Sequence, residues 1–334
     1  MVKKIITLWY IFILFISNLM AQGVTYTGTS VANFLKIGFS AKSVSMAESN
    51  LSLSEDASTL YLNPGVISWL EKSSVSFSYI NWLVDTKISY LSLAIPFDFG
   101  TMGFDLAYFS SGDILETTIL KQEGTGRVVS ASDLSLGLSY AKNFTDRFSV
   151  GLKVKYLRES LVSVSASTFA LDIGSVFKTS ILNDMKIGIA LSNFGGTMQF
   201  TGNELITTQT VPFSPTNKQI PAVFQTESWD LPLMIKLGIS TNAIETKNYK
   251  LSLGYTLVDS RDYTMRSNLG ASLKIFDVFE LNGGYRFNYD EVSYSLGVGV
   301  KANTNFAGDI LLNYAFTNFG RLGLINQFSL SISF

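Results

Sequence analysis

The sequence predicts an all-β protein, an antiparallel β-barrel of about 14 strands that spans a membrane, with a short helical and turn segment before it. Three observations support this fold class. Charged residues are scarce, apolar residues alternate with small or polar residues along most of the chain, and the final strand ends on an aromatic residue, Phe334.

The composition favours a membrane protein. Charged residues make up 15% of the 334 residues, against roughly 25% in an ordinary soluble domain, and 47% are hydrophobic. After the N-terminus, no stretch approaches the roughly 18 consecutive apolar residues that a spanning helix needs. Because a bilayer admits only helices and closed barrels, the remaining solution is a barrel. A soluble antiparallel solenoid is the alternative fold.

The N-terminus has the pattern of an export signal. Lys3 and Lys4 precede an apolar run at residues 5–16, and a small residue, Ala21, ends the segment before Gln22. We therefore expect residues 1–21 to be a cleaved signal peptide and the mature chain to reach the outer membrane. The alternative is an uncleaved anchor helix, which also directs the chain across the inner membrane.

The sequence lacks the residues that several functions require. There is no His, the usual general base, and no Cys for a disulfide, a lipid anchor or redox work. Acidic residues outnumber basic ones, so we expect no nucleic acid as a partner. The neighbouring carboxylates of Glu55 and Asp56 are interpreted as part of a solvated loop. We expect no enzyme activity, no cofactor and no metal site.

Residues 22–72 differ from the rest of the chain and are called the hatch segment below. They mix Ser, Ala and small apolar residues without sustained alternation, and they contain the turn-forming sequence Tyr61-Leu62-Asn63-Pro64-Gly65. The sequence predicts short helices and turns here.

The barrel is predicted over residues 73–334, where apolar residues recur at every second position, as in 134–140 and 292–300. Apolar side chains would face lipid, and Ser, Gly, Asn and Lys would face a narrow lumen. The expected strands are 73–83, 86–97, 100–112, 130–143, 148–161, 166–179, 185–195, 231–243, 249–259, 264–276, 279–289, 291–302, 306–317 and 323–334.

The connections alternate between tight turns and two long loops, 113–129 and 196–230. This asymmetry is typical of outer-membrane barrels, whose long loops lie at the cell surface. Counting strands places both chain termini on the periplasmic side. Prolines at 212, 215, 221 and 232 are expected to keep the second loop irregular.

A set of basic residues shares the polar parity of the strands and is expected to point into the lumen. Asp105, Asp172 and Asp309 have the same parity, so internal ion pairs that stiffen the barrel are the favoured interpretation. A binding site for an anionic ligand is the alternative. The candidates are Lys153, Lys155, Lys186, Lys236, Lys274, Arg286 and Lys301.

The last strand alternates without interruption and stops at the chain end. It resembles the C-terminal signal by which the barrel assembly machinery recognises outer-membrane proteins. The residues of this signal are Phe328, Leu330, Ile332 and Phe334. Expected partners are therefore this machinery and outer-membrane lipid.

The stretch from Phe34 to Ala47, with Asp56-Ala57 and the turn at residues 61–65, resembles the PorV/PorQ family of FadL-like outer-membrane barrels. The resemblance extends over the mature chain, although relatives read Met-Gly and Asn-Pro-Ala where this chain has Met46-Ala47 and Asn63-Pro64-Gly65. It implies that residues 34–66 plug the periplasmic side. The motif residues are Gly38, Ala41, Lys42, Met46, Asp56, Tyr61, Asn63 and Pro64.

Similarity to PorV implies an accessory or shuttle role in type IX protein secretion and surface attachment. The partners would be the translocon and secreted proteins with C-terminal sorting domains. Similarity to FadL implies instead passage of hydrophobic or amphiphilic small molecules, with such a molecule as ligand. A purely structural membrane protein is a third hypothesis. One barrel can host many functions, so strand physics alone does not choose among them.

Overall fold

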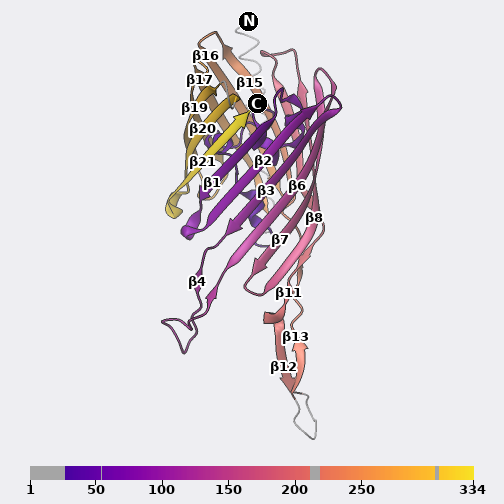
Figure 1. Cartoon of the computed structure of the whole chain (residues 1–334), viewed down its shortest axis with the longest axis vertical. Helices are drawn as coiled ribbons and strands as arrows, with labels where there is room; N and C mark the ends of the chain where they lie inside the picture. Colours follow the sequence, from indigo (N-terminus) through magenta and orange to yellow (C-terminus); the bar gives the residue numbers. More distant parts are fainter. Residues whose placement is uncertain (1–26, 54, 211–218, 305–307) are drawn as a thin grey trace.

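The computed structural model of the chain describes residues 27–53, 55–210, 219–304 and 308–334. Its main feature is a closed antiparallel barrel of fourteen long strands (Figure 1). Each strand pairs with its neighbours in the chain, and the last strand pairs with the first along eight residues to close the cylinder. The predicted fold class and strand number are confirmed. The predicted signal peptide lies outside the described residues.

The fourteen barrel strands agree with the predicted ones, and no bound differs by more than three residues. They are β1 (Ser74–Asn81), β2 (Lys87–Phe97), β3 (Gly100–Ser110), β6 (Ala131–Thr145), β7 (Phe148–Leu161), β8 (Val164–Lys178), β9 (Lys186–Gly195), β15 (Met234–Glu245), β16 (Tyr249–Ser260), β17 (Tyr263–Ile275), β18 (Phe279–Phe287), β19 (Tyr294–Thr304), β20 (Gly308–Asn318) and β21 (Leu324–Ser333).

Side chains alternate between the two faces of the wall. On β7, Leu152 and Val154 are about half exposed on the outer face, whereas Lys153 between them is buried in the lumen. A wall that is apolar outside and polar inside is the arrangement that lipid requires of a barrel. Among the described residues, no helix is both long and apolar enough to cross a membrane.

The two ends of the barrel differ. Short connections such as 98–99 and 146–147 lie at the end that also holds Phe334, which we call the turn end. The long connections 111–130 and 196–233 project from the opposite end, the loop end (Figure 1). Outer-membrane barrels keep short turns in the periplasm, so the turn end is the periplasmic end.

The long connections contain small strands of their own. In the second of them, β12 and β13 form a projecting hairpin, and Pro221 lies in β13 opposite Thr208. The prediction of irregular structure is wrong for Pro221, because a two-stranded ribbon leaves an outer edge where no backbone donor is needed. Pro212 and Pro215 lie outside the described residues. The small strands are β4 (Ile114–Leu115), β5 (Val128–Val129), β10 (Met198–Gln199), β11 (Thr201–Gly202), β12 (Ile206–Thr210), β13 (Gln219–Val223) and β14 (Ser228–Trp229).

The hatch segment runs inside the barrel as short helices joined by turns. Side-chain oxygens of Ser40, Asp56 and Asn63 accept bonds from backbone N–H groups at the starts of three of these helices, as N-caps do. The helices are η1 (Asn33–Lys36), α2 (Ala41–Ser45), η2 (Ala57–Tyr61) and η3 (Pro64–Trp69). Further single turns lie in the loops at η4 (Leu83–Asp85), η5 (Asn203–Leu205) and η6 (Gly320–Leu322).

The described part of the hatch segment begins at the loop end. Ser30 forms a β-bridge with Asp230, and Lys36 pairs with Asp262, so residues 27–36 lie at the loop end. The chain then passes through the lumen and reaches the turn end before β1. The predicted position of the N-terminus concerns residues 1–26, which lie outside the described residues.

Candidate functional site

Barrel glycines allow the wall to touch the backbone of the hatch segment. A Cβ on Gly174 would collide with Asn63, and one on Gly284 would collide with the backbone of Met46 and Ala47. Equivalent contacts occur on each of eight consecutive strands around the barrel, from β7 to β19. This glycine belt consists of Gly151, Gly174, Gly188, Gly238, Gly254, Gly270, Gly284 and Gly297.

On the remaining arc of the wall, serines contact the hatch segment. The backbone N–H of Ala41 donates to Ser329 Oγ at 2.9 Å, and that of Ala57 donates to Ser74 Oγ at 3.1 Å. Ser78 and Ser329 also bond to each other across the β1–β21 seam at 2.7 Å. Small side chains therefore bring the wall close to the hatch segment on this side as well.

The motif residues of the hatch segment have structural contacts inside the lumen. The Tyr61 ring packs against both Phe39 and Tyr90, with centroid distances of 5.3 and 5.9 Å, and these two rings stack on each other at 5.0 Å. Asn63 donates to the Leu51 carbonyl and, across to the barrel, to that of Ser175, each at 3.1 Å. Of the others, Gly38 packs against Val44, Met46 against the glycine belt, and Pro64 against Gly151.

A charged cluster, the latch, fastens the hatch segment to β17 and β18. Lys42 Nζ lies 2.9 Å from Glu280 and 2.6 Å from Glu55, and Glu55 also pairs with Lys274. Burial lowers the pKa of Lys42, but Glu280 and Glu55 outweigh it, so the net pKa is raised. Burial likewise raises the pKa of Glu55, and the two lysines reverse this to a lowered value. The solvated-loop interpretation is wrong for Asp56, which is buried, whereas Glu55 lies in an exposed bend and pairs there with the two lysines.

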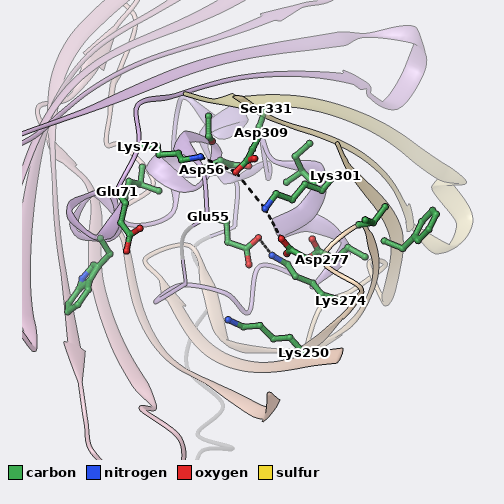
Figure 2. A pocket seen from close by; sticks show the side chains of 17 residues that line it. Glu55, Asp56, Glu71, Lys72, Lys250, Lys274, Asp277, Lys301, Asp309 and Ser331 are labelled. Atoms are coloured by element: carbon green, nitrogen blue, oxygen red, sulfur yellow. Dashed lines mark hydrogen bonds and ion pairs between the residues drawn. The ribbon is translucent and has the colours of Figure 1, made fainter. Parts of the chain in front are cut away.

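A pocket of about 380 Å³ lies at the turn end, and the latch residues Glu55, Lys274 and Glu280 line it. Figure 2 shows the side chains around it. Lys301 points between Asp277 and Asp309, at 2.9 and 3.6 Å, and Lys72 reaches Asp309 at 3.4 Å. Nearby, the Lys186 ammonium lies 5.1 Å from the centre of the Trp69 ring. Several charged residues that line this pocket, such as Lys250 and Lys274, have partners of opposite sign.

Deeper in the lumen, two of the predicted lysines are buried in ion pairs. Lys153 lies 3.1 Å from Asp105, and Lys155 lies 2.8 Å from Asp172. Asp172 also accepts the backbone N–H of Asn193 at 2.7 Å. Such fully paired buried charges stiffen a wall and leave no free group for a ligand.

The loop-end half of the lumen contains a cavity of about 870 Å³, which we call the mouth cavity. Phe34 of the hatch segment and the wall residues Trp82 and Phe319 give it an aromatic side. Trp229 and Phe200, from the second long connection, also line it. The volume is in the range of ligand-binding cavities, and the lining combines aromatic with charged and polar side chains.

Some polar groups of the mouth cavity make no hydrogen bond or ion pair with the described residues, and others do. Lys236 makes no ion pair or hydrogen bond there, and Asn268 Oδ1 and Gln327 Nε2 are likewise unbonded. Arg286 bonds Ser295, and its carboxylate neighbour Glu48 is 3.7 Å away. Of these, only Lys236 and Arg286 were predicted. Asn268 and Gln327 have inward parity on predicted strands, and that signal could have identified them.

Two carboxylates that were not predicted from the sequence also line the mouth cavity. Asp133 of β6 and Glu159 of β7 are directly paired across neighbouring strands. No cation of the described residues lies within ion-pair distance of either. Like charges placed opposite each other destabilise a sheet. The pair therefore places two carboxyl groups side by side on one part of the cavity.

The C-terminal strand has the expected positions. Phe328 and Leu330 are exposed on the outer face, Ile332 is half-buried, and Phe334 is exposed beyond the strand end. The Phe334 N–H donates to the Ser73 carbonyl at 2.9 Å, which ties the chain end to the start of β1.

A comparison with protein-family models gives one decisive match. The model described as type IX secretion system protein PorV matches residues 20–226 of this chain, which is more than half of it. The chain belongs to the PorV family. The PorV match spans the hatch segment, β1 to β9 and most of the second long connection. No curated protein sequence matches the chain.

Solved structures with the same fold are FadL-like barrels. The chain is similar to the Pseudomonas putida toluene transporter TodX, with 12% identity, a TM-score of 0.55, and coverage of 89% of this chain and 97% of that one. It is also similar to the Ralstonia pickettii toluene transporter TbuX, with 13% identity, a TM-score of 0.54, and coverage of 91% and 98%. At this identity, the likeness of the PorV-family chain to these structures shows the fold alone.

Proposed function

We propose that this chain is a non-enzymatic accessory or shuttle component of type IX protein secretion, exported by a cleaved signal peptide and resident in the outer membrane. The PorV family match over residues 20–226 carries this proposal. The partners are the type IX translocon and secreted proteins that carry C-terminal sorting domains.

The geometry of the lumen supports a role at the cell surface. The mouth cavity and the pocket at the turn end share no lining residue, and the hatch segment lies between them against the glycine belt. A protein segment bound at the mouth therefore stays on the outer side. This arrangement suits a carrier that holds cargo and hands it over.

The direct test is a comparison of surface proteins with and without the gene. Deletion is expected to remove secreted proteins that carry C-terminal sorting domains from the cell surface, and a plasmid copy is expected to restore them. An unchanged set of surface proteins after deletion would refute the proposal.

A second candidate function is transport of a hydrophobic or amphiphilic small molecule. The mouth cavity favours it, because aromatic side chains and the cations Lys236 and Arg286 line the same space. Passage through the lumen would require the hatch segment to move away from the glycine belt. A role in secretion at the cell surface does not require the hatch segment to move.

A disulfide between the hatch segment and the barrel separates the two functions. Ser52 Oγ lies 2.9 Å from Ser240 Oγ on β15, and the chain has no Cys, so Ser52→Cys with Ser240→Cys offers only one pair. The oxidised double variant is expected to support surface attachment of cargo at the wild-type level. The single variants and the reduced form are controls. Loss of attachment that a reductant restores would contradict the proposal and favour a moving hatch segment.

A further inference from the structure

Three cationic side chains gather on one arc of the mouth cavity, which we call the cationic arc. They are Lys236 on β15, Arg266 on β17 and Arg286 on β18, and all three line the cavity. In the strand register, Lys236 pairs with Val258 and Val258 pairs with Arg266, so these two cations occupy one row across three neighbouring strands. Arg286 lies opposite Asn268, two residues along β17 from Arg266. The Cα atoms of Lys236 and Arg266 are therefore about 10 Å apart, and those of Arg266 and Arg286 about 8 Å.

The cationic arc has few partners of opposite charge. Lys236 is 8% exposed and makes no hydrogen bond or ion pair with the described residues. Arg266 makes no hydrogen bond with them either, its buried Nε has no partner, and its ion pair, at 3.7 Å, is with Asp290, whose side chain is 88% exposed. Arg286 has Glu48 at 3.7 Å. Glu48 is the one carboxylate of the described residues that pairs with the arc inside the cavity, which leaves an excess of two positive charges.

The other charges of the mouth cavity do not neutralise this arc. Lys36 and Asp262 pair with each other. Glu159 lies on β7 beside its acidic neighbour on β6, and no ion pair joins either of them to a described cation. The register row through Lys236 reaches β7 at Gly151, eight residues before Glu159. The acidic pair is therefore displaced from the cationic arc both around the wall and along the strands.

Arg266 is held so that its edge can bind a ligand. Its guanidinium carbon lies 3.8 Å from the centre of the Tyr263 ring and 4.4 Å from that of Tyr289. Stacking uses the face of a guanidinium and leaves the in-plane N–H groups, the fork that binds phosphate or carboxylate oxygens. Arg286 donates to Ser295 Oγ at 2.5 Å, which uses one of its five N–H groups. Two such forks and one ammonium suit an anion with three acceptor oxygens and a double charge.

We propose that Lys236, Arg266 and Arg286 bind the phosphoryl group of a phosphate monoester at the cell-surface end of the lumen. Such a group carries a charge of about −1.5 to −2 at neutral pH and three acceptor oxygens, which match the excess charge of the arc and its three cationic side chains. Asn268 Oδ1, on a side chain that is 1% exposed, is unbonded and accepts a hydroxyl of the same ligand. The inference goes beyond the proposed function, because it assigns a ligand to the cavity whether or not the chain acts in secretion.

Isothermal titration of the purified full chain in neutral detergent tests the inference. The probes are glycerol 3-phosphate as a soluble phosphate monoester, phosphatidic acid in mixed micelles as a lipid one, and laurate as a carboxylate amphiphile. We expect Lys236→Met to weaken binding of a phosphate monoester by at least about tenfold, the ratio that one charge-assisted hydrogen bond provides. Because Lys236 has no partner among the described residues, this variant is expected to fold.

A second variant and a matched control separate binding from folding. Arg266→Lys keeps the positive charge but loses the fork, and it is expected to weaken binding of a phosphate monoester as well. Lys250→Met removes a positive charge from β16 at the turn end, where Lys250 pairs with Glu245, and it should bind as the wild type does. Heat-modifiable migration on a gel confirms that each variant is folded.

The two phosphate probes distinguish the source of the ligand. Binding of glycerol 3-phosphate would support a soluble phosphate monoester, and binding of phosphatidic acid alone would support a lipid headgroup. Three outcomes would overturn the inference. These are no binding of either phosphate monoester, wild-type binding of them by Lys236→Met, and laurate binding that is as tight as that of phosphatidic acid and equally dependent on Lys236, which would assign the cationic arc to a carboxylate amphiphile.

Discussion

The two halves of the lumen solve the problem of buried polar groups differently. In the turn-end half, the hatch segment touches the glycine belt, and Lys42, Glu55, Lys274 and Glu280 neutralise one another. In the loop-end half, a cavity remains and Lys236 has no partner among the described residues. The same chain can therefore pair its charges where the structure depends on them. Among the buried lysines of the described residues, Lys236 is the exception.

The largest effect is expected from a methyl group in the glycine belt. Gly284→Ala places a Cβ against the backbone of Met46 and Ala47, which cannot yield as a flexible side chain would. The folded, heat-modifiable form of the barrel should be lost or strongly reduced. Gly283→Ala on the same strand is the control, because its Cβ would meet only the Leu296 side chain at 3.3 Å. Equal folding of both variants would contradict a tightly held hatch segment.

A smaller effect is expected at the latch. Lys42→Met leaves the Glu280 and Glu55 carboxylates without their shared cation, and breaking a buried ion pair in this way costs about 3–5 kcal/mol. Proteolysis of the hatch segment in detergent should accelerate accordingly. Lys72→Met removes a charge from an exposed pair with Asp309 and should cost less than about 1 kcal/mol. Similar proteolysis of the two variants would mean that the latch contributes little.

The latch also predicts a dependence on pH. The lowered pKa of Glu55 contributes stability above its unfolded value of 4.5, and this contribution declines as the pH falls below that value. The raised pKa of Lys42 contributes fully below 10.5 and is lost only at higher pH. The protection factors of hatch-segment amides, which are the intrinsic hydrogen-exchange rates divided by the measured rates at each pH, should therefore be constant from about pH 5 to 9 and fall in acid. A loss of protection already present near neutral pH would argue against the latch.

The smallest effect on stability is expected at the mouth. Gln327→Met replaces an amide whose nitrogen is unbonded by an apolar side chain of similar size, so the free energy of unfolding should change by less than about 1 kcal/mol. Thermal unfolding in detergent measures this change. A large destabilisation would show that Gln327 supports the fold, and it would weaken the contrast between the two halves.

The sequence predicted the barrel well because its signal is local. On β7, the alternation of Leu152, Lys153 and Val154 already assigns each side chain to lipid or lumen. The path of the hatch segment, by contrast, depends on contacts between residues that are far apart in the sequence. That Gly174 makes room for Asn63 depends on positions more than a hundred residues apart, and no periodicity records such a contact.

The candidate site was predicted only in part, for a similar reason. Parity placed Lys236 and Lys153 in the lumen alike, but whether a lysine meets a carboxylate depends on the register of neighbouring strands. Asp172, for example, lies opposite Lys153 in the strand register, yet it pairs most closely with Lys155. Asp133 and Glu159 were missed because their pairing is visible only once β6 and β7 are aligned.

The seam between β1 and β21 bears on how the protein is made. The hatch segment precedes every strand in the chain, and β21, the last strand synthesised, is the one that completes the wall through β1. The glycine belt holds the wall against the backbone of the hatch segment. We therefore expect the sheet to curl around the hatch segment during assembly, with the serines of the first and last strands meeting last.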